Sequence, residues 1–276
     1  MKPTWAFSSA TVRTTDWPEE FALLRRFRWK AVHLWYDKMK GCLEKGATCA
    51  DLGRQLHDAG IAPVGLAPGV VWTPSTGHDP RLELDDLAQR MDVAMALGAP
   101  SLSIAAVGKA KGDLAAEYRH LADKLRGVAG MADARGLRLN LEFIGGADVN
   151  GTMGSCMDLI EMIDHPAVGM VLDVCHYYAS ASHVEELSRL PKGRLFLVHV
   201  GDVPRQPMEA LGGEHRCFPG EGRIDLAGLI REIHKRTRYK GPWCLELVDR
   251  DLWAMDARDV FKKASAALKK VEKQLA

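Results

Sequence analysis

Four short apolar runs of the sequence each end in a residue that can bind a metal ion or carry a proton. The four residues are Glu142, Asp173, His199 and Glu246, and the intervals between them are 31, 26 and 47 residues. The first two intervals correspond to about one strand-and-helix repeat, and the third is longer by a loop. Buried close together, three carboxylates would repel one another, and each would cost free energy to remove from water. A divalent cation would compensate for both effects, so the pattern predicts a metal site; taken singly, each residue could instead cap a strand or pair with Arg or Lys.

The donor set of three carboxylates and one imidazole indicates the kind of metal. Such ligands favour one divalent ion, Mn²⁺, Mg²⁺, Co²⁺ or Zn²⁺, over thiophilic metals. A closed structural zinc site would contain Cys or more His. The six cysteines are scattered without a CxxC pair, so they are predicted to be reduced.

The elements that must position these residues follow from the hydrophobic pattern. Eight apolar runs are predicted as strands, at residues 5–10, 31–36, 61–67, 101–107, 137–144, 168–175, 195–200 and 243–248. Amphipathic stretches at residues 82–97, 114–134, 157–163, 226–236 and 257–273 are predicted as helices, and Asp225 is predicted as the N-cap of the fourth. Strands and helices therefore alternate, as they do in parallel sheets with helical crossovers.

Eight such units predict an α/β fold, a closed (β/α)8 TIM barrel, formed by a single domain over residues 1–276. A doubly wound open sheet is the alternative. The lack of a GxGxxG motif after the first strand argues against the dinucleotide-binding form of that sheet. In a barrel, the strand-end residues would surround one mouth.

Composition restricts the class of partner. The chain has 37 Lys and Arg against 36 Asp and Glu, a net charge of +1, so no global field would attract nucleic acid or an anionic membrane. The first ten residues lack the apolar core of a signal peptide, and no run approaches the roughly 20 apolar residues of a membrane span. These features predict a cytoplasmic protein that binds neither nucleic acid nor membrane.

Several local motifs resemble the sugar phosphate isomerase/epimerase superfamily, the xylose isomerase-like TIM barrels. The resemblance is strongest between residues 136 and 249 and is closest to the inosose isomerase branch. The motifs are Glu142-Phe143-Ile144-Gly145, Asp173-x-x-His176, His199-x-x-Asp202-x-x-Arg205, and Arg216-x-Phe218-Pro219-Gly220-Glu221-Gly222-x-Ile224-Asp225-Leu226.

The resemblance implies that the four strand-end residues hold one divalent metal, as the pattern itself predicts. It also implies that Glu142 and Glu246 exchange protons with a substrate carbon, and that His176 and Arg205 contact substrate oxygens. A metal that holds a carbonyl and the neighbouring hydroxyl would acidify the carbon between them, and an enediolate would form. The implied function is a metal-dependent isomerase or epimerase of a keto-sugar or keto-inositol. His176 could instead orient the carboxylate of Asp173.

Further residues are candidates for substrate binding. His215 and Arg216 lie on the long loop after the seventh strand and either reach the mouth or are solvated. Asp148 occupies the position where ketose 3-epimerases carry a substrate-binding glutamate. His33 and Trp35 alternate on the second strand, one face of which must point inward, so these residues could form a sugar-stacking wall or simply fill the barrel.

Three other functions remain open at this point. A lyase or dehydratase of a cyclic polyol ketone would share the first proton abstraction. Phosphodiester hydrolysis, as in endonuclease IV, would need further histidines at the ends of strands three and four, where the sequence has Leu66-Ala67 and Ile104-Ala105. A non-catalytic sugar-binding barrel is the third.

The predicted partner is a small polyol or keto-sugar. Gly212-Gly213, Gly220 and Gly222 could bind a phosphate through backbone amides, but no Arg or Lys clamp accompanies them, so an unphosphorylated substrate is favoured. The metal, the substrate, the choice between isomerase, epimerase and lyase, and a homo-oligomeric state are left open.

Overall fold

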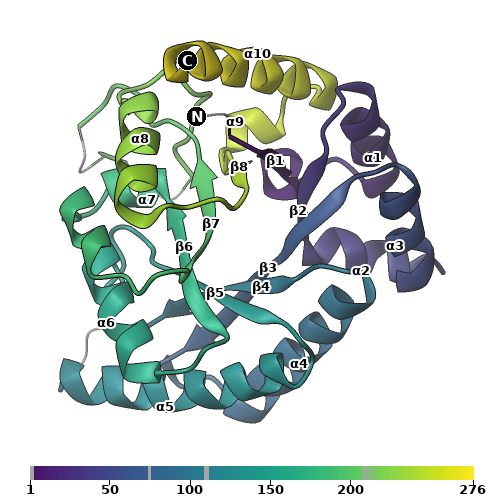
Figure 1. Ribbon diagram of the computed structural model, residues 1–276. Coiled ribbons are helices and arrows are strands. Elements are labelled where there is room, and N and C mark those ends of the chain that lie inside the picture. Colours follow the sequence, from purple (N-terminus) through teal and green to yellow (C-terminus); the bar gives the residue numbers. More distant parts are fainter. Residues whose placement is uncertain (1–2, 74–75, 109–111, 208–209, 212–213) are drawn as a thin grey trace.

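The computed structural model describes residues 3–73, 76–108, 112–207, 210–211 and 214–276. Within these residues the strands pair in parallel and in chain order into a closed barrel, in which the last strand meets the first (Figure 1). The strands are β1 (Trp5–Ser8), β2 (Ala31–Trp35), β3 (Ala62–Trp72), β4 (Ser101–Val107), β5 (Arg138–Glu142), β6 (Val168–Asp173), β7 (Leu195–Val200) and β8 (Trp243–Leu245). The predicted (β/α)8 TIM barrel is confirmed, and the open-sheet alternative is wrong.

Helices cover the outside of the barrel (Figure 1). The α-helices are α1 (Trp17–Arg26), α2 (Tyr36–Glu44), α3 (Cys49–Asp58), α4 (Pro80–Ala96), α5 (Leu114–Asp133), α6 (Met153–Ile163), α7 (Val174–Tyr178), α8 (Leu226–Thr237), α9 (Arg250–Trp253) and α10 (Ala257–Leu275), and the 3-10 helices are η1 (Ser9–Val12) and η3 (Val184–Ser188). The five helices expected from the sequence correspond to α4, α5, α6, α8 and α10. The short helices α1, α2 and α3 were not among the expected elements.

The third strand is longer than predicted. The sequence pattern ends it at Ala67, because Pro68 and Gly69 are typical of turns. In the structure β3 pairs with β2 as far as Ala67 and then, after a shift of register, pairs with β4 from Gly69 to Trp72. A Cβ on Gly69 would lie 2.7 Å from Cγ2 of Ile104, so glycine permits this close approach. Leu66-Ala67 and Ile104-Ala105 were compared above with the histidine positions of endonuclease IV at the ends of these strands. They therefore lie inside β3 and β4 and not at the strand ends.

Other strands end earlier than predicted, because a side chain begins the next helix. The sixth strand stops at Asp173, whose carboxylate accepts the backbone N–H groups of Cys175 and His176 and caps α7. The first strand stops at Ser8, where the hydroxyl oxygen accepts the N–H of Ala10 at the start of η1. The predicted helix cap at Asp225 is confirmed, since its carboxylate accepts the N–H of Gly228.

Apolar side chains fill most of the interior, but one layer inside the barrel is polar. His33, Ser101, Ser103 and Asn140 are each at most 2% exposed. On the outside, Trp5 of β1 donates its indole N–H to Glu272 of α10, at a distance of 2.8 Å, and so joins segments from the two ends of the chain.

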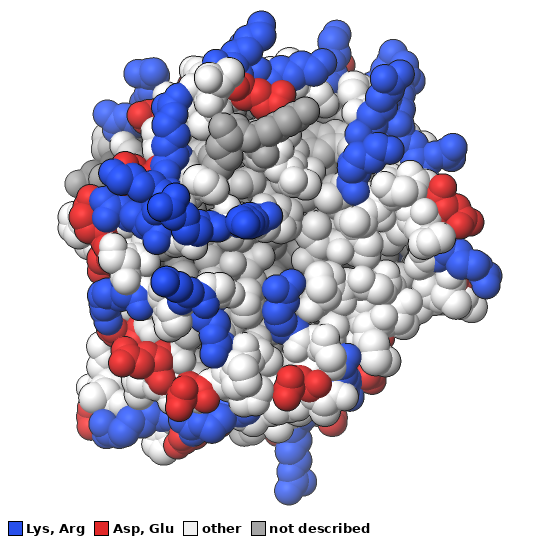
Figure 2. Space-filling view, in the orientation of Figure 1, with Lys and Arg blue, Asp and Glu red and all other residues white. Residues whose placement is uncertain are grey.

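Figure 2 shows Lys and Arg side chains projecting around the rim of one face, with Asp and Glu among them and a largely uncharged centre. In the described part of the chain, no helix is both long and apolar enough to cross a bilayer.

Candidate metal centre

The barrel brings the four strand-end residues together. Glu142 is the last residue of β5, Asp173 ends β6, His199 lies one residue before the end of β7, and Glu246 directly follows β8. Register supports this arrangement, because Asp173 pairs directly with His199 in the sheet. One ligand atom from each residue lies within 4.8 Å of the corresponding atoms of the other three. The predicted convergence at one mouth is therefore present.

Nδ1 of His199 lies among the three carboxylates. It is 3.1 Å from Oε1 of Glu142, 3.1 Å from Oε2 of Glu246 and 3.9 Å from Oδ2 of Asp173. His199 and Asp173 are almost completely buried, and the Glu142 side chain is 16% exposed. The group is thus shielded from water except on the side of the two glutamates.

Fixed donors hold the other oxygen of two of these carboxylates. The Ser8 hydroxyl donates to Oε1 of Glu246 at 2.8 Å. Oδ1 of Asp173 accepts two backbone N–H groups and also Nη1 of Arg216, at 2.7 Å. Glu246 and Asp173 therefore each have one carboxylate oxygen bound by the protein and the other directed toward Nδ1 of His199, as expected of ligands oriented by their neighbours.

Electrostatic interactions in the group are strong. Burial lowers the pKa of His199, but the charges of Glu246 and Glu142 outweigh burial and raise it well above its ordinary value. Burial opposes ionisation of Glu246, yet the charge and hydrogen bond of His199 hold the pKa of that carboxyl far below its usual range. A proton on Nδ1 thus compensates the carboxylates when no metal ion does. Three carboxylates and one imidazole converging on one point fit a divalent ion with oxygen and nitrogen ligands.

His176 and Arg216 lie next to this group. Arg216 is 5% exposed, and its Nη2 lies 3.3 Å from Nε2 of His176. Nδ1 of His176 accepts the N–H of Gly145, at 3.2 Å. Both residues were predicted to bind substrate, which stays a prediction, and the structure shows that Arg216 pairs with Asp173. Their observed contacts orient that carboxylate, which agrees with the alternative stated for His176.

The loop after β7 is organised by Asp202, a residue of the His199-x-x-Asp202 motif. The buried carboxylate of Asp202 accepts four backbone N–H groups at 2.9 to 3.0 Å, from Val203, Gly220, Gly222 and Ile224. A Cβ on Gly222 would lie 2.1 Å from the Val203 carbonyl oxygen, so only glycine fits there. The Pro-Gly-Glu-Gly motif is therefore accounted for by the folding of the loop.

Asp202 also pairs through its backbone with Cys217, the neighbour of Arg216. The loop thereby places Arg216 against the metal-facing carboxylate of β6. The phosphate site that the sequence left as the less favoured possibility is not supported at Gly220 and Gly222, because their N–H groups are bound to Asp202. Gly212-Gly213 lie outside the described residues.

Replacing Asp202 by Ala should lower the free energy of unfolding by about 3 kcal/mol, because four N–H groups would lose their acceptor. Urea unfolding would measure the loss. Glu221→Ala, an exposed change in the same loop, is the control and should leave stability within about 0.5 kcal/mol of the parent. A D202A protein as stable as E221A would contradict this explanation of the motif.

Three of the predicted substrate residues are not brought into the group. Arg205 and His215 are exposed on the loop after β7, and Asp148 is exposed on the loop after β5. His215 lines a small hollow together with His176 and Arg216. A role in substrate binding for these three residues stays a prediction.

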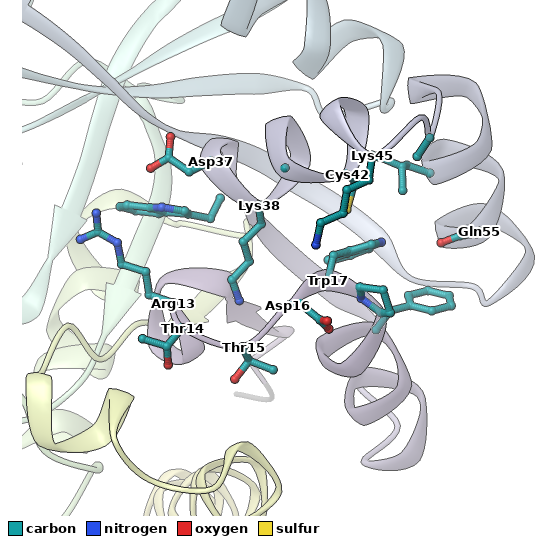
Figure 3. Close-up of a pocket in the computed structure, with 16 residues that line it drawn as sticks. Arg13, Thr14, Thr15, Asp16, Trp17, Asp37, Lys38, Cys42, Lys45 and Gln55 are labelled. Carbon is teal, nitrogen blue, oxygen red and sulfur yellow. The ribbon is translucent and has the colours of Figure 1, made fainter.

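Trp35, the remaining predicted substrate residue, ends β2 and is half-buried. The guanidinium carbon of Arg13 lies 5.2 Å from the centre of its ring. Both residues line a hollow of about 670 Å³ beside α1, α2 and α3 (Figure 3). Lys38 of this hollow is already bound, since its ammonium donates to the Val12 carbonyl and pairs with Glu20. The four strand-end residues do not line this hollow, and a role for Trp35 in substrate binding stays a prediction.

Sequence reasoning missed Ser8 as a member of the site. Its signal was available, because Ser8 is a polar residue directly after the apolar residues 5–7, a pattern like the one that selected the four candidate ligands. The predicted strand runs to Ala10, which places Ser8 in its interior.

Comparison with known proteins gives the family. The sequence profile described as the xylose isomerase-like TIM barrel matches residues 21–271. A 3-dehydroshikimate dehydratase of Pseudomonas putida is 29% identical over 194 residues, which cover 69% of this chain and 30% of that protein. An inosose isomerase of Halalkalibacterium halodurans is 28% identical over 147 residues, covering 53% of this chain and 52% of the isomerase. The matched stretches thus span about half or less of these relatives.

A solved structure shows the same fold. An IOLI protein crystallised with a bound zinc atom superposes with a TM-score of 0.88 at 21% sequence identity, and the match covers 99% of both chains. The resemblance expected from the motifs between residues 136 and 249 is confirmed. Since the family profile spans nearly the whole sequence, the chain belongs to the xylose isomerase-like TIM barrel family.

Proposed function

We propose that this protein is a divalent-metal-dependent isomerase or epimerase of a keto-sugar or keto-inositol. The observation that carries the proposal is the convergence of Glu142, Asp173, His199 and Glu246 within 4.8 Å. Its inosose isomerase relative and the zinc atom of the IOLI protein support the substrate class and the metal.

These four residues would hold the ion. When bound, a divalent metal would polarise the carbonyl of the substrate and acidify the neighbouring C–H group. The residues available to move that proton are Glu142 and Glu246. Each has a carboxylate oxygen 3.1 Å from Nδ1 of His199, so both border the same space. One carboxylate can take the proton from a substrate carbon and the other can return a proton to its neighbour.

The surroundings of the two glutamates differ. Glu246 is 9% exposed and the Ser8 hydroxyl holds one of its oxygens, whereas Glu142 is the most accessible of the four residues. Ser8 therefore fixes the direction in which Glu246 presents its second oxygen. Arg216 does the same for Asp173, and this leaves the acid–base work to the two glutamates.

A dehydratase is the second candidate, because the Pseudomonas putida dehydratase matches 69% of this chain. The first step would be the same removal of a proton next to a ketone. The electron pair would then expel a neighbouring hydroxyl group, which leaves as water after it gains a proton from a carboxylic acid of the site. The two functions differ only in whether this group departs.

Product analysis by NMR in D₂O separates the candidates. The metal-loaded protein would be incubated with a keto-inositol and, separately, with 3-dehydroshikimate, and chelated protein would be the control. We expect metal-dependent incorporation of deuterium next to the ketone of the keto-inositol and a rearranged product of unchanged composition. Loss of water from 3-dehydroshikimate with no reaction of the keto-inositol would replace the isomerase by the dehydratase. No deuterium incorporation into these or other keto-sugars would contradict the proposal.

A further inference from the structure

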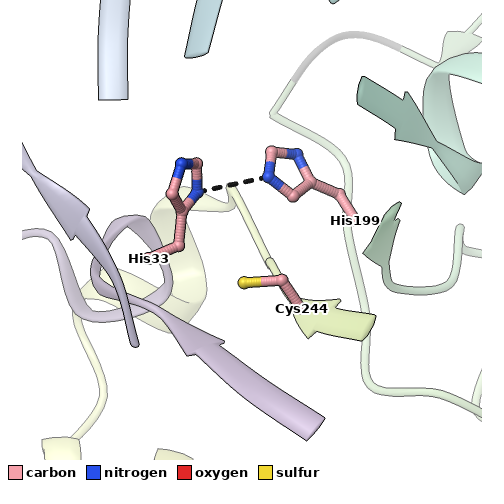
Figure 4. A group of neighbouring side chains, drawn as sticks. All are labelled: His33, His199 and Cys244. Atoms are coloured by element: carbon pink, nitrogen blue, oxygen red, sulfur yellow. Dashed lines mark hydrogen bonds between the residues drawn. The ribbon is translucent and has the colours of Figure 1, made fainter. Parts of the chain in front are cut away.

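Behind the candidate metal centre, a second imidazole contacts His199. His33 of β2 is 1% exposed, and its Nδ1 lies 3.2 Å from Nε2 of His199 (Figure 4). The two nitrogens of His199 therefore face different environments. Nδ1 faces the carboxylates, and Nε2 faces the single buried imidazole of His33.

Cys244 lies beside the two rings (Figure 4), so this group could in principle be a second metal site. The contact between the two rings argues against that function, because an ion bound by both imidazoles would replace the hydrogen bond between them. A hydrogen bond joins His33 and His199 directly. The group is therefore a hydrogen-bonded pair of imidazoles beside a thiol.

The polar layer inside the barrel continues from this pair. Nε2 of His33 lies 3.1 Å from the Ser103 hydroxyl, and the side-chain amide of Asn140 donates to Ser103 at 3.2 Å and to Ser101 at 2.9 Å. The Ser101 hydroxyl in turn donates to a backbone carbonyl of β3. Ser103 thus provides an acceptor for a proton on Nε2 of His33, which leaves Nδ1 of His33 as an acceptor.

Glycine on the next strand makes room for this arrangement. A Cβ on Gly65 of β3 would lie 3.1 Å from Cδ2 and 3.2 Å from Nε2 of His33, and 2.9 Å from the Ser101 hydroxyl. These distances are too short for a side chain without movement of its neighbours. Gly65 therefore gives the His33 ring its place inside the barrel.

We propose that His33 is a positioning residue that accepts the Nε2–H of His199 and so reserves the Nδ1 lone pair of His199 for the metal. A neutral imidazole carries one proton. With no acceptor behind the ring, the single proton of the neutral ring would lie on Nδ1, where two carboxylates accept it. With His33 present, the proton that remains after the metal displaces the Nδ1 proton is held at Nε2. The inference rests on the metal-binding part of the proposed function.

Paired substitutions test the role of the acceptor. His33→Leu removes it at similar volume, whereas His33→Asn places an amide oxygen near the position of Nδ1. Titration calorimetry with Zn²⁺ or Mn²⁺ should show metal affinity 10- to 100-fold weaker in H33L, the usual effect of losing such a partner, and largely recovered in H33N. Ser101→Ala is the control, because it alters the same layer without touching either imidazole.

NMR of the zinc-loaded parent, with ¹⁵N-labelled histidine, tests the direction of the hydrogen bond and needs no substitution. We expect a proton covalently attached to Nε2 of His199, with coupling across the hydrogen bond to Nδ1 of His33. A proton attached to Nδ1 of His33 would overturn the inference. It would also be overturned if folded H33L bound metal as tightly as the parent, or if H33L, H33N and S101A weakened binding equally.

These results are separable from the fate of the proposed function, because neither measurement uses a substrate. A parent protein that binds no divalent metal would refute the proposed function. A parent that binds metal with the same affinity as H33L would refute only the role of His33.

Discussion

Glu246→Gln should lower kcat/KM by about 10³-fold or more, the effect expected when a group that carries a proton in the reaction is lost. The amide keeps the shape of the carboxylate and its contact with Ser8, but it carries no charge and cannot take a proton. It also removes one of the three negative charges around Nδ1 of His199. The substitution therefore affects both proposed roles of this residue.

The two roles are separated by measuring metal content beside steady-state kinetics on the keto-inositol. If E246Q keeps its metal and loses turnover, the loss lies in proton transfer; if metal is lost too, the carboxylate is needed as a ligand. Glu44→Gln is the matched control, because Glu44 is exposed on α2, where it pairs with Lys40, and it should retain parental activity. An E246Q protein with parental kcat/KM would refute the assignment of the site.

Chelation should abolish turnover, and Mn²⁺ or Co²⁺ should restore it. The physical reason is that the four side chains crowd three carboxylates around a single imidazole, an arrangement that a proton compensates only in part. Activity would be followed during treatment with EDTA and on re-addition of each metal, with Ca²⁺ as a comparison for an ion that prefers more oxygen ligands. Undiminished activity in metal-free protein, checked by elemental analysis, would rule out metal dependence.

Reloading should also depend on pH in a defined direction. The pKa of His199 lies well above its ordinary value in the metal-free chain, so Nδ1 is protonated and the metal must displace that proton. Below this raised pKa, metal affinity should increase about tenfold for each unit of pH. Calorimetry between pH 6 and 8 would measure it. An affinity that does not change with pH would show that no proton is displaced.

The sequence was sufficient to predict the ring of strands and the four candidate ligands, because both depend on a repeating local pattern. Apolar runs ending in Glu142, Asp173 and His199 recur with strand-and-helix spacing, and parallel closure then brings their ends together whatever the details of the loops. The cap at Asp225 is equally local. These predictions needed no knowledge of which side chains touch.

What could not be predicted depends on contacts between distant strands. Arg216 was expected to meet substrate, and its pairing with Asp173 follows from the fold of a loop around Asp202 that periodicity does not reveal. The length of β3 was missed because Pro68 and Gly69 resemble a turn until the close packing against Ile104 is known. The sequence indicates only that His33 fills the barrel or forms part of a sugar-stacking wall, because its partner His199 lies 166 residues away.

The closure of β1 on β8 has a consequence for how the protein acquires its metal. Ser8 and Glu246, which touch at 2.8 Å, are 238 residues apart, and ordering so long a segment is entropically costly and slow. An incompletely closed ring could already contain Glu142, Asp173, His199 and, through the pairing of β8 with β7, Glu246, but it would lack the Ser8 hydroxyl that orients the Glu246 carboxylate. Full affinity for the ion during refolding would therefore report the joining of the first and last strands.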